Sequence, residues 1–111
     1  MVEYQNSLDE VFGAIADPTR RAILQQLGEN PARVTDIAKN FPVSLNAVSK
    51  HLMVLEQAGL IRREIQGREH LIQLDNRPLQ AASRWLEARA FWNERLDALE
   101  AHVLRKRQSK R

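Results

Sequence analysis

The hydrophobic positions of this chain recur with a helical period over its first half. Apolar residues follow one another at three- or four-residue spacings in residues 8–16, 18–28 and 44–59, and a shorter run of the same kind lies at 35–40. Such spacing places the apolar side chains on one face of a helix. The pattern therefore predicts four helices before residue 60, of which the third is short.

Two of these helices carry end signals in their sequence. Asp17 stands immediately before Pro18, and Ser44 precedes the run at 45–59, so both side chains are expected to cap a helix N-terminus. Gly28 and Gly59 follow the last apolar positions of their runs. Because glycine adopts left-handed backbone angles at low cost, each is expected to end its helix.

The period changes from helical to alternating after residue 59. Residues 60–65 and 70–74 alternate β-branched or apolar side chains with polar ones, and Gln66-Gly67 lies between them. Two alternating runs joined by a glycine-containing turn predict a β-hairpin, with Gln66-Gly67 as its two-residue turn.

A last helix is expected to start within residues 75–78 and to reach about Leu104. Four helices, a hairpin and a long helix predict a mainly α-helical fold with a small β-hairpin, the winged helix-turn-helix. With 111 residues the chain has the length of one domain. We expect this domain at residues 8–104, preceded by an N-terminal arm at 1–7 and followed by a basic tail at 105–111.

Charge is distributed unevenly along the chain. The tail RKRQSKR holds five of the seventeen Lys and Arg and no acid, so the net charge of +3 becomes −2 without it. Residues 20–70 hold eight basic and five acidic residues. This surplus favours a polyanionic partner, although an ordinary surface would also account for it. The tail either adds salt-sensitive, non-specific affinity for DNA or has no role.

Several classes of function are not expected. No apolar run approaches eighteen residues, so no membrane span is predicted, and MVEYQNSLDE does not resemble a secretory signal, which makes the cytoplasm the default location. The chain has no cysteine, which excludes disulfides and thiolate metal sites. It also lacks a glycine-rich phosphate loop and a nucleophile elbow. We therefore expect neither an enzyme nor a cofactor.

The helix at 44–59 has an outer face suited to a DNA groove. Val48, Leu52 and Leu55 form its inner stripe when 100° is allowed per residue. Base contacts are expected from the residues in the N-terminal half of the opposite face, Asn46, Ala47, Ser49 and Lys50. These side chains are short or flexible; Asn can bond adenine in a bidentate manner, and Ala can touch a thymine methyl. The alternative is a solvated face that carries small residues by chance.

Arginines gather near the tip of the expected hairpin. Arg62, Arg63 and Arg68 lie on either side of the turn, and Arg63 and Arg68 are expected to contact DNA phosphates. A charged strand edge that resists aggregation is the alternative. Arg20 and Arg21, at the start of the second helix, fit either a phosphate contact or a solvated helix face.

The chain resembles the ArsR-type bacterial repressors in three segments, FGAIADPTRRAILQQL, VSLNAVSKHLMVLEQAGLI and REIQGREHLIQL. The resemblance covers about residues 8–104 and implies a homodimeric winged-helix repressor that binds an inverted-repeat operator in double-stranded DNA. The positions that match the recognition helix of that family are Ser44, Asn46, Ala47, Ser49, Lys50 and His51. Its wing matches Gly67 and the flanking arginines. The full set expected at phosphates is Ser44, His51, Arg63, Gln66, Gly67 and Arg68.

The same resemblance does not carry over metal sensing. Metal-sensing members often use cysteines, which are missing here, and a second pattern uses Asp and His residues on the last helix. Asp97 and His102 lie there with Glu94 nearby, but no second imidazole stands at a suitable spacing. We therefore expect no metal site, and the last helix resembles a subgroup without one.

The last helix carries a near-heptad apolar seam, with spacings of 7, 4, 3 and 4 from Trp85 to Val103. The first helix offers apolar residues that could complete the buried surface. The dimer interface is expected to contain Val11, Phe12, Ile15, Trp85, Trp92, Leu96, Leu99 and Val103. Burial within one chain is the alternative. A two-fold dimer would place two recognition helices about one DNA turn apart. The alternative function is that of a winged helix that binds proteins instead of specific DNA.

Overall fold

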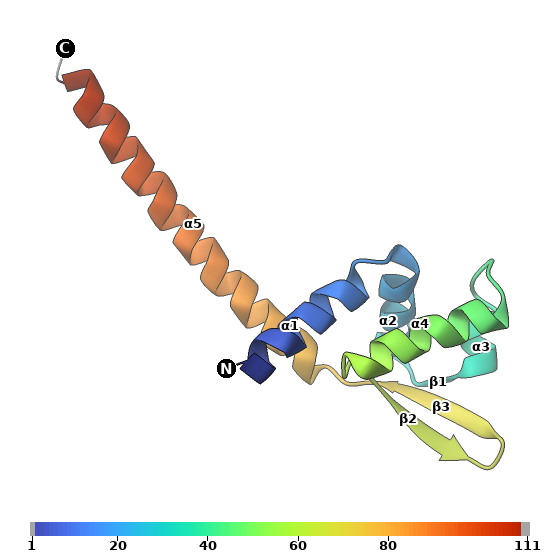
Figure 1. Cartoon of the computed structure of the whole chain (residues 1–111). Coiled ribbons are helices and arrows are strands. Elements are labelled where there is room, and N and C mark those ends of the chain that lie inside the picture. Colours follow the sequence, from blue (N-terminus) through green and yellow to red (C-terminus); the bar gives the residue numbers. More distant parts are fainter. Residues whose placement is uncertain (1, 110–111) are drawn as a thin grey trace.

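The computed structural model describes the backbone of residues 2–109 and the side chains of residues 8–108. Two parts are apparent in Figure 1: a head, residues 8–82, and the distal part of one long helix, residues 83–109, which projects away from it. The molecule is accordingly elongated, 75 Å in its longest dimension. In chain order the elements are α1 (Val2–Ile15), α2 (Pro18–Glu29), β1 (Ala32–Arg33), α3 (Val34–Ala38), α4 (Leu45–Gln57), β2 (Ile61–Gln66), β3 (Glu69–Leu74) and α5 (Arg77–Ser109).

Capping side chains start α2 and α4 as predicted. The Asp17 carboxylate accepts a hydrogen bond from the backbone N–H of Arg20 at 3.0 Å, and the Ser44 hydroxyl accepts one from the N–H of Ala47 at 3.1 Å. Gly59 follows α4 with a φ of 75°, which is the left-handed conformation that ends a helix. Each of these local signals is confirmed.

Other boundaries differ from the predicted ones. Gly28 does not end α2, which continues through Glu29 to a cap at Asn30. In the hairpin, Gln66 pairs with Glu69, so the two-residue turn is Gly67-Arg68 and not Gln66-Gly67. Gly67 has a φ of 63° and therefore occupies the first turn position, where a type II′ turn requires glycine.

The two ends of the chain are more helical than expected. The segment 1–7, expected to be an arm, is helical from Val2, and α5 continues past Leu104 to Ser109. Arg, Lys and Gln are good helix formers, and cations near a helix C-terminus interact favourably with its dipole, which accounts for the extension into the basic tail. Met1, Lys110 and Arg111 lie outside the described residues.

The hairpin belongs to a three-stranded antiparallel sheet with the order β1-β3-β2. β1 is only two residues long and pairs Ala32 with Ile72 and Arg33 with Leu71. A strand of two residues is too short to produce an alternating pattern, so the sequence did not predict it. Its effect is to hold the start of α3 against the hairpin.

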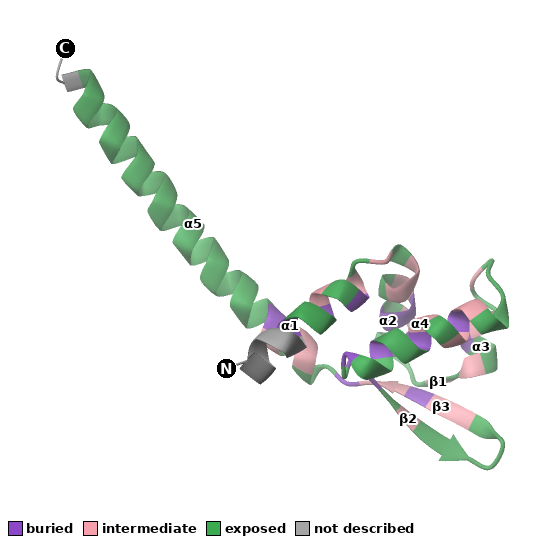
Figure 2. Ribbon diagram, in the orientation of Figure 1, coloured by how far each residue is buried: buried purple, intermediate pink, exposed green. Residues whose placement is uncertain are grey.

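One hydrophobic core fills the head. Its largest fully buried side chains come from α1, α2, α3, α4, the segment before β2, and β3: Val11, Ile23, Ile37, Val48, Leu52, Leu55, Leu60 and Ile72. Ala82, in the second turn of α5, is the last buried residue in the described part of the chain. From residue 83 to residue 108 every side chain is exposed (Figure 2).

α1 packs on the beginning of α5. The rings of Phe12 and Trp85 meet edge to face with their centroids 5.7 Å apart. Val11 is only 1% exposed and belongs to the core of its own chain. Its predicted place in a dimer interface is therefore wrong, because it keeps almost no surface for a partner. Phe12 and Ile15 stay half-buried.

Candidate nucleic-acid interface

The recognition helix predicted from the sequence is α4, and it lies at the surface of the head beside the wing formed by β2 and β3 (Figure 1). Its inner stripe, Val48, Leu52 and Leu55, is completely buried. Asn46 and Lys50 are exposed on the opposite side. Burial of one stripe therefore fixes which face of α4 remains available to a ligand.

The four expected base-contact residues do not share one environment. Asn46 and Lys50 are exposed, whereas Ala47 and Ser49 are half-buried. Ser49 also lines a hollow between α4 and the wing. The structure thus keeps Asn46 and Lys50 on the outermost face and turns Ser49 toward the wing.

Ser44 combines a structural role with an available donor. Its oxygen accepts the N–H of Ala47, and the side chain is exposed. A hydroxyl that accepts one hydrogen bond can still donate its own hydrogen. Ser44 can therefore cap α4 and donate to an anionic oxygen at the same time.

His51 is held by the corner between α1 and α2. Its Nδ1 lies 3.3 Å from a terminal nitrogen of Arg20 and 4.0 Å from the Asp17 carboxylate, and its side chain is 22% exposed. Because a guanidinium can only donate, Nδ1 is the acceptor, which places the proton of the neutral ring on Nε2. The structure does not bring His51 together with the wing residues that were expected to share phosphates with it.

Arg20 and Arg21, for which the sequence allowed either a phosphate contact or a solvated helix face, have hydrogen-bond partners within the chain. Arg20 donates to the carbonyl oxygens of Gly13 and Ala14, at 3.2 and 2.6 Å, and Arg21 donates to that of Ile15 at 2.8 Å. These carbonyls belong to the last turn of α1, whose acceptors have no partner within the helix. The positive charges of Arg20 and Arg21 also interact favourably with the negative C-terminal end of the α1 dipole.

The backbone N–H of Arg20 also affects the pKa of Asp17. The hydrogen bond from the backbone N–H of Arg20 is the largest influence on the pKa of Asp17 and lowers it; burial opposes this effect, and the nearby charge of Arg20 lowers the pKa further. The carboxylate form that caps α2 is therefore the favoured one.

In the wing, Arg63 is already oriented by other side chains. It donates to Nδ1 of His70 at 2.9 Å and, more weakly, to the carboxylate of Glu56 at 3.4 Å. Arg68 stands at the tip, exposed, and makes no hydrogen bond or ion pair within the described residues. Gln66 and Gly67 are exposed beside it.

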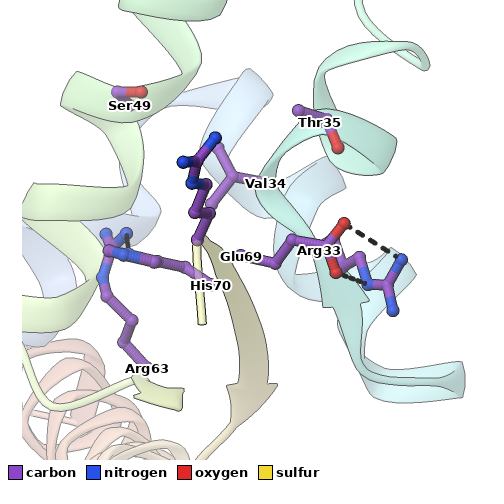
Figure 3. A pocket seen from close by; sticks show the side chains of 8 residues that line it. Arg33, Val34, Thr35, Ser49, Arg63, Glu69 and His70 are labelled. Carbon is purple, nitrogen blue, oxygen red and sulfur yellow. Dashed lines mark hydrogen bonds and ion pairs between the residues drawn. The ribbon is translucent and has the colours of Figure 1, made fainter. Parts of the chain in front are cut away.

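A hollow of about 330 Å³ lies between α4, the start of α3 and the wing (Figure 3). It is lined by Arg33, Val34, Thr35, Ser49, Arg63, Arg68, Glu69 and His70. The structure therefore brings Arg63 and Arg68, which were expected to act together, next to Ser49. Arg33 and Thr35 were not predicted, and only the pairing of β1 with β3, which the sequence did not reveal, places them here.

Two further properties bear on function. Among residues 8–108, no group of three His, Asp or Glu side chains is placed to hold a metal ion. None of the helices in the described part of the chain is both long and apolar enough to cross a membrane.

Known proteins share both the sequence and the architecture. Residues 15–64 match a helix-turn-helix domain family. The chain is 40% identical over 90 residues to the HTH-type transcriptional regulator Rv2034 of Mycobacterium tuberculosis, covering 81% of this chain and 82% of that protein. It is 37% identical over 79 residues to the transcriptional repressor SdpR of Bacillus subtilis, covering 71% and 88%.

Solved structures agree with these relatives. An ArsR-like transcriptional regulator from Rhodococcus is 35% identical, has a TM-score of 0.74, and is matched over 86% of this chain and 91% of its own. A second ArsR family regulator is 39% identical with the same TM-score, over 80% and 93% of the two chains. The resemblance noted in the sequence is confirmed over most of the molecule: the chain belongs to the ArsR family of winged helix-turn-helix transcriptional regulators.

Proposed function

We propose that this regulator is a homodimeric repressor that binds an inverted-repeat operator in double-stranded DNA, with one α4 in each half-site. The observation that carries the proposal is the exposed N-terminal face of α4, which has the wing beside it at the same end of the head (Figure 1). A helix and a hairpin in this relation suit a major groove and its flanking backbone. Such a regulator would act in the cytoplasm, where the chromosome lies.

Asn46 and Lys50 are proposed to read base edges, with Ala47 against a thymine methyl. Both polar side chains are exposed and one helical turn apart on the outer face. An amide can bond adenine through two hydrogen bonds, and an ammonium group can bond guanine. Short side chains at the start of a helix allow the backbone to come close to the groove floor.

Phosphate contacts are proposed for residues around this face: Ser44, Arg63, Gln66, Gly67 and Arg68. The unpaired guanidinium of Arg68 supports this role most directly, because it is exposed and has no partner in the described residues. Arginine suits phosphate through its planar set of donors.

A dimer through α5 is supported by apolar surface that one chain leaves uncovered. Trp85, Trp92, Leu96, Leu99 and Val103 are each 43–60% exposed and follow one stripe of the helix. A stripe of this length is typical of a protein interface. Phe12, half-buried on α1, meets Trp85 at one end of this stripe, and Ile15 is half-buried on the same helix. A second copy of the chain is the partner whose own stripe is complementary by symmetry.

Repression is supported by the names of the relatives, since SdpR is a transcriptional repressor. A dimer seated on an operator represses by occupying DNA that the transcription machinery needs.

The test is selection of genomic duplex fragments by the purified protein, followed by sequencing, at two salt concentrations. An enriched inverted repeat with half-sites about one helical turn apart is expected. Retention without enrichment would contradict operator binding and leave only phosphate attraction, which falls steeply with salt. In that case the α4 face would next be tested against protein partners.

A further inference from the structure

We propose that the hollow between α3, α4 and the wing holds a single backbone phosphate of the bound duplex, with Arg33, Thr35 and Ser49 as ligands beside the wing arginines. This inference rests on the proposed DNA binding and deepens it. It reassigns Ser49 from base reading to phosphate binding, and it adds two residues from outside α4 and the hairpin.

Two hydroxyl groups lie on facing walls of the hollow. Figure 3 shows Ser49 on α4 at one side of the hollow and Thr35 on α3 at the other, with Val34 between Thr35 and the wing. Each hydroxyl can donate one hydrogen bond to an anionic oxygen. Ser49 is half-buried, whereas Asn46 and Lys50 are exposed. Its short side chain is therefore better placed for the hollow than for a base edge at the groove floor.

The side chains around the hollow carry a net positive charge. Three guanidinium groups line the hollow, those of Arg33, Arg63 and Arg68, against the single carboxylate of Glu69. Glu69 forms an ion pair with Arg33 at 3.0 Å. Arg63 forms an ion pair at 3.4 Å with Glu56, which does not line the hollow. Even with both carboxylates counted, one positive charge is left over. An anion that enters the hollow would restore neutrality through charge-assisted hydrogen bonds.

Two of the three cationic side chains are held in position before any ligand arrives. His70 accepts from Arg63 at 2.9 Å, and Glu69 accepts from Arg33 (Figure 3). Side chains that are already ordered lose little conformational entropy when they bind. Only Arg68, at the tip, would have to become ordered, and it would close the hollow from the wing side.

The hollow also has a size and a position that suit a phosphate of the DNA backbone. A hollow of about 330 Å³ has room for a phosphate group together with several waters, each of which needs about 30 Å³. It lies between the outer face of α4 and the wing. When α4 enters a major groove, the sugar-phosphate backbone at the groove edge passes between these two elements. The phosphate is therefore assigned to the DNA backbone.

The experiment replaces single phosphates of the selected operator by neutral methylphosphonates, one position at a time, and measures the affinity of the wild-type protein and five variants. Thr35→Val, Ser49→Ala and Arg68→Ala each remove one proposed ligand. Arg62→Ala is the matched control, because Arg62 lies on the same hairpin but outside the hollow and is exposed. Circular dichroism and thermal melting verify that each variant is folded.

One phosphate in each half-site is expected to couple to all three of the tested ligands, Thr35, Ser49 and Arg68. Neutralising it should weaken wild-type binding about tenfold, since a hydrogen bond to a charged group is worth that much or more. The same neutralisation should weaken Thr35→Val, Ser49→Ala and Arg68→Ala by about threefold or less, because part of the interaction is already lost. Arg62→Ala should keep the full tenfold loss. Arg33→Ala, which also breaks the bridge to Glu69, should show the same reduced response.

Three results would overturn the inference while leaving operator binding intact. The three ligands could couple to different phosphates, they could couple to none, or Ser49→Ala could change the base preferred at one operator position without any coupling. The last result would return Ser49 to base reading. If the wild-type protein selects no operator at all, the proposed function fails, and the phosphate site fails with it.

Discussion

The head and the distal part of α5 use the same helical period but differ completely in burial. In the head, the apolar stripes of α1, α2 and α4 meet one another and the sheet, and fifteen hydrophobic residues are buried. In residues 83–108 the seam is just as regular, yet none of its side chains is buried. Periodicity therefore identifies an apolar face, but only the chain's own topology decides whether that face has a partner in the same molecule.

This difference assigns separate tasks to the two regions. The core of the head holds α4, the wing and the start of α3 in fixed relation, so one chain is sufficient to build the proposed DNA-reading surface. Apart from the contact of Trp85 with Phe12, the distal part of α5 projects away from its own head (Figure 1), and two heads would be joined through it. Recognition of a half-site and spacing of the two half-sites would then be encoded in different segments.

The largest expected effect comes from placing charge in the seam. Leu96→Glu combined with Leu99→Glu should give a monomer, because two carboxylates per chain would meet their copies in the interface. Operator affinity should fall by about 1,000-fold or more, since a single head keeps only half of the specific contacts. Sedimentation equilibrium measures the first effect and operator titration the second.

Ala101→Glu is the matched control for this variant, because Ala101 is exposed and lies on the side of α5 opposite the seam. It should remain dimeric with wild-type affinity. A seam variant that stays dimeric would show that the two chains meet elsewhere.

The next effect isolates the stability of the head. Leu52 is completely buried, and Leu52→Ala should lower the free energy of unfolding by about 2–5 kcal/mol through lost burial and a residual cavity. Urea unfolding in the monomeric Leu96→Glu/Leu99→Glu background measures the head alone, because dimer formation no longer contributes. Met53→Ala is the control: Met53 is the next residue and is 54% exposed. Its loss should stay within about 0.5 kcal/mol.

A dependence of this unfolding on protein concentration in the monomeric background would contradict the division of tasks between the head and the distal part of α5. It would mean that the head is not an independent folding unit and needs contacts from a second chain.

The third effect concerns base reading in the head. Asn46→Ala should cost about 1–3 kcal/mol on the operator and relax the preference at one base pair, with little loss on random duplex. Gln57→Ala, on the same exposed face but at the C-terminal end of α4, should change neither. Equal losses from Asn46→Ala on operator and random DNA would instead indicate a phosphate contact.

How much of this could be predicted from the sequence depends on how local the cause was. The caps at Asp17 and Ser44, the helix end at Gly59 and the buried stripe of α4 each depend on neighbouring residues, and all are confirmed. The prediction that Gly28 ends α2 is wrong, because the helix continues to its cap at Asn30. The backbone N–H of Asn30 still donates to the carbonyl oxygen of Gln26.

The candidate site shows the opposite case. Arg33 and Thr35 reach the hollow only because β1 pairs with β3, and that pairing joins residues about forty positions apart. His51 was expected at a phosphate, but the corner of α1 and α2 holds it through Arg20. Val11 was expected between two chains, yet its own core covers it. Each of these placements is decided by tertiary packing, which no local pattern contains.

The smallest expected effect lies at the junction of β3 and α5, at Asp75. This buried carboxylate accepts three hydrogen bonds from Arg77, one from the backbone N–H at 3.1 Å and two from the guanidinium at 3.0 and 2.7 Å. Its own N–H donates to the carbonyl of Leu60 at 2.8 Å. The side-chain hydrogen bonds from Arg77, followed by the backbone one, lower the pKa of Asp75 from 3.8 to about 2. The first turn of α5 is thereby fixed to the end of β3.

Because the pKa is lower in the folded protein, the ionised carboxylate stabilises the fold above pH 3.8, and this stabilisation is lost as the pH falls toward 2. Asp75→Asn should therefore lower the free energy of unfolding by about 1–2 kcal/mol at neutral pH; solvent weakens the ion pair, because the Arg77 side chain is 81% exposed. The difference from wild type should shrink between pH 4 and pH 2, as measured by urea unfolding in the monomeric background. Asp36→Asn, which removes an exposed pair with Lys39 at 3.6 Å, should cost less than about 0.5 kcal/mol. A loss at Asp75 that persists unchanged at pH 2 would show that the junction depends on the shape of the side chain and not on its charge.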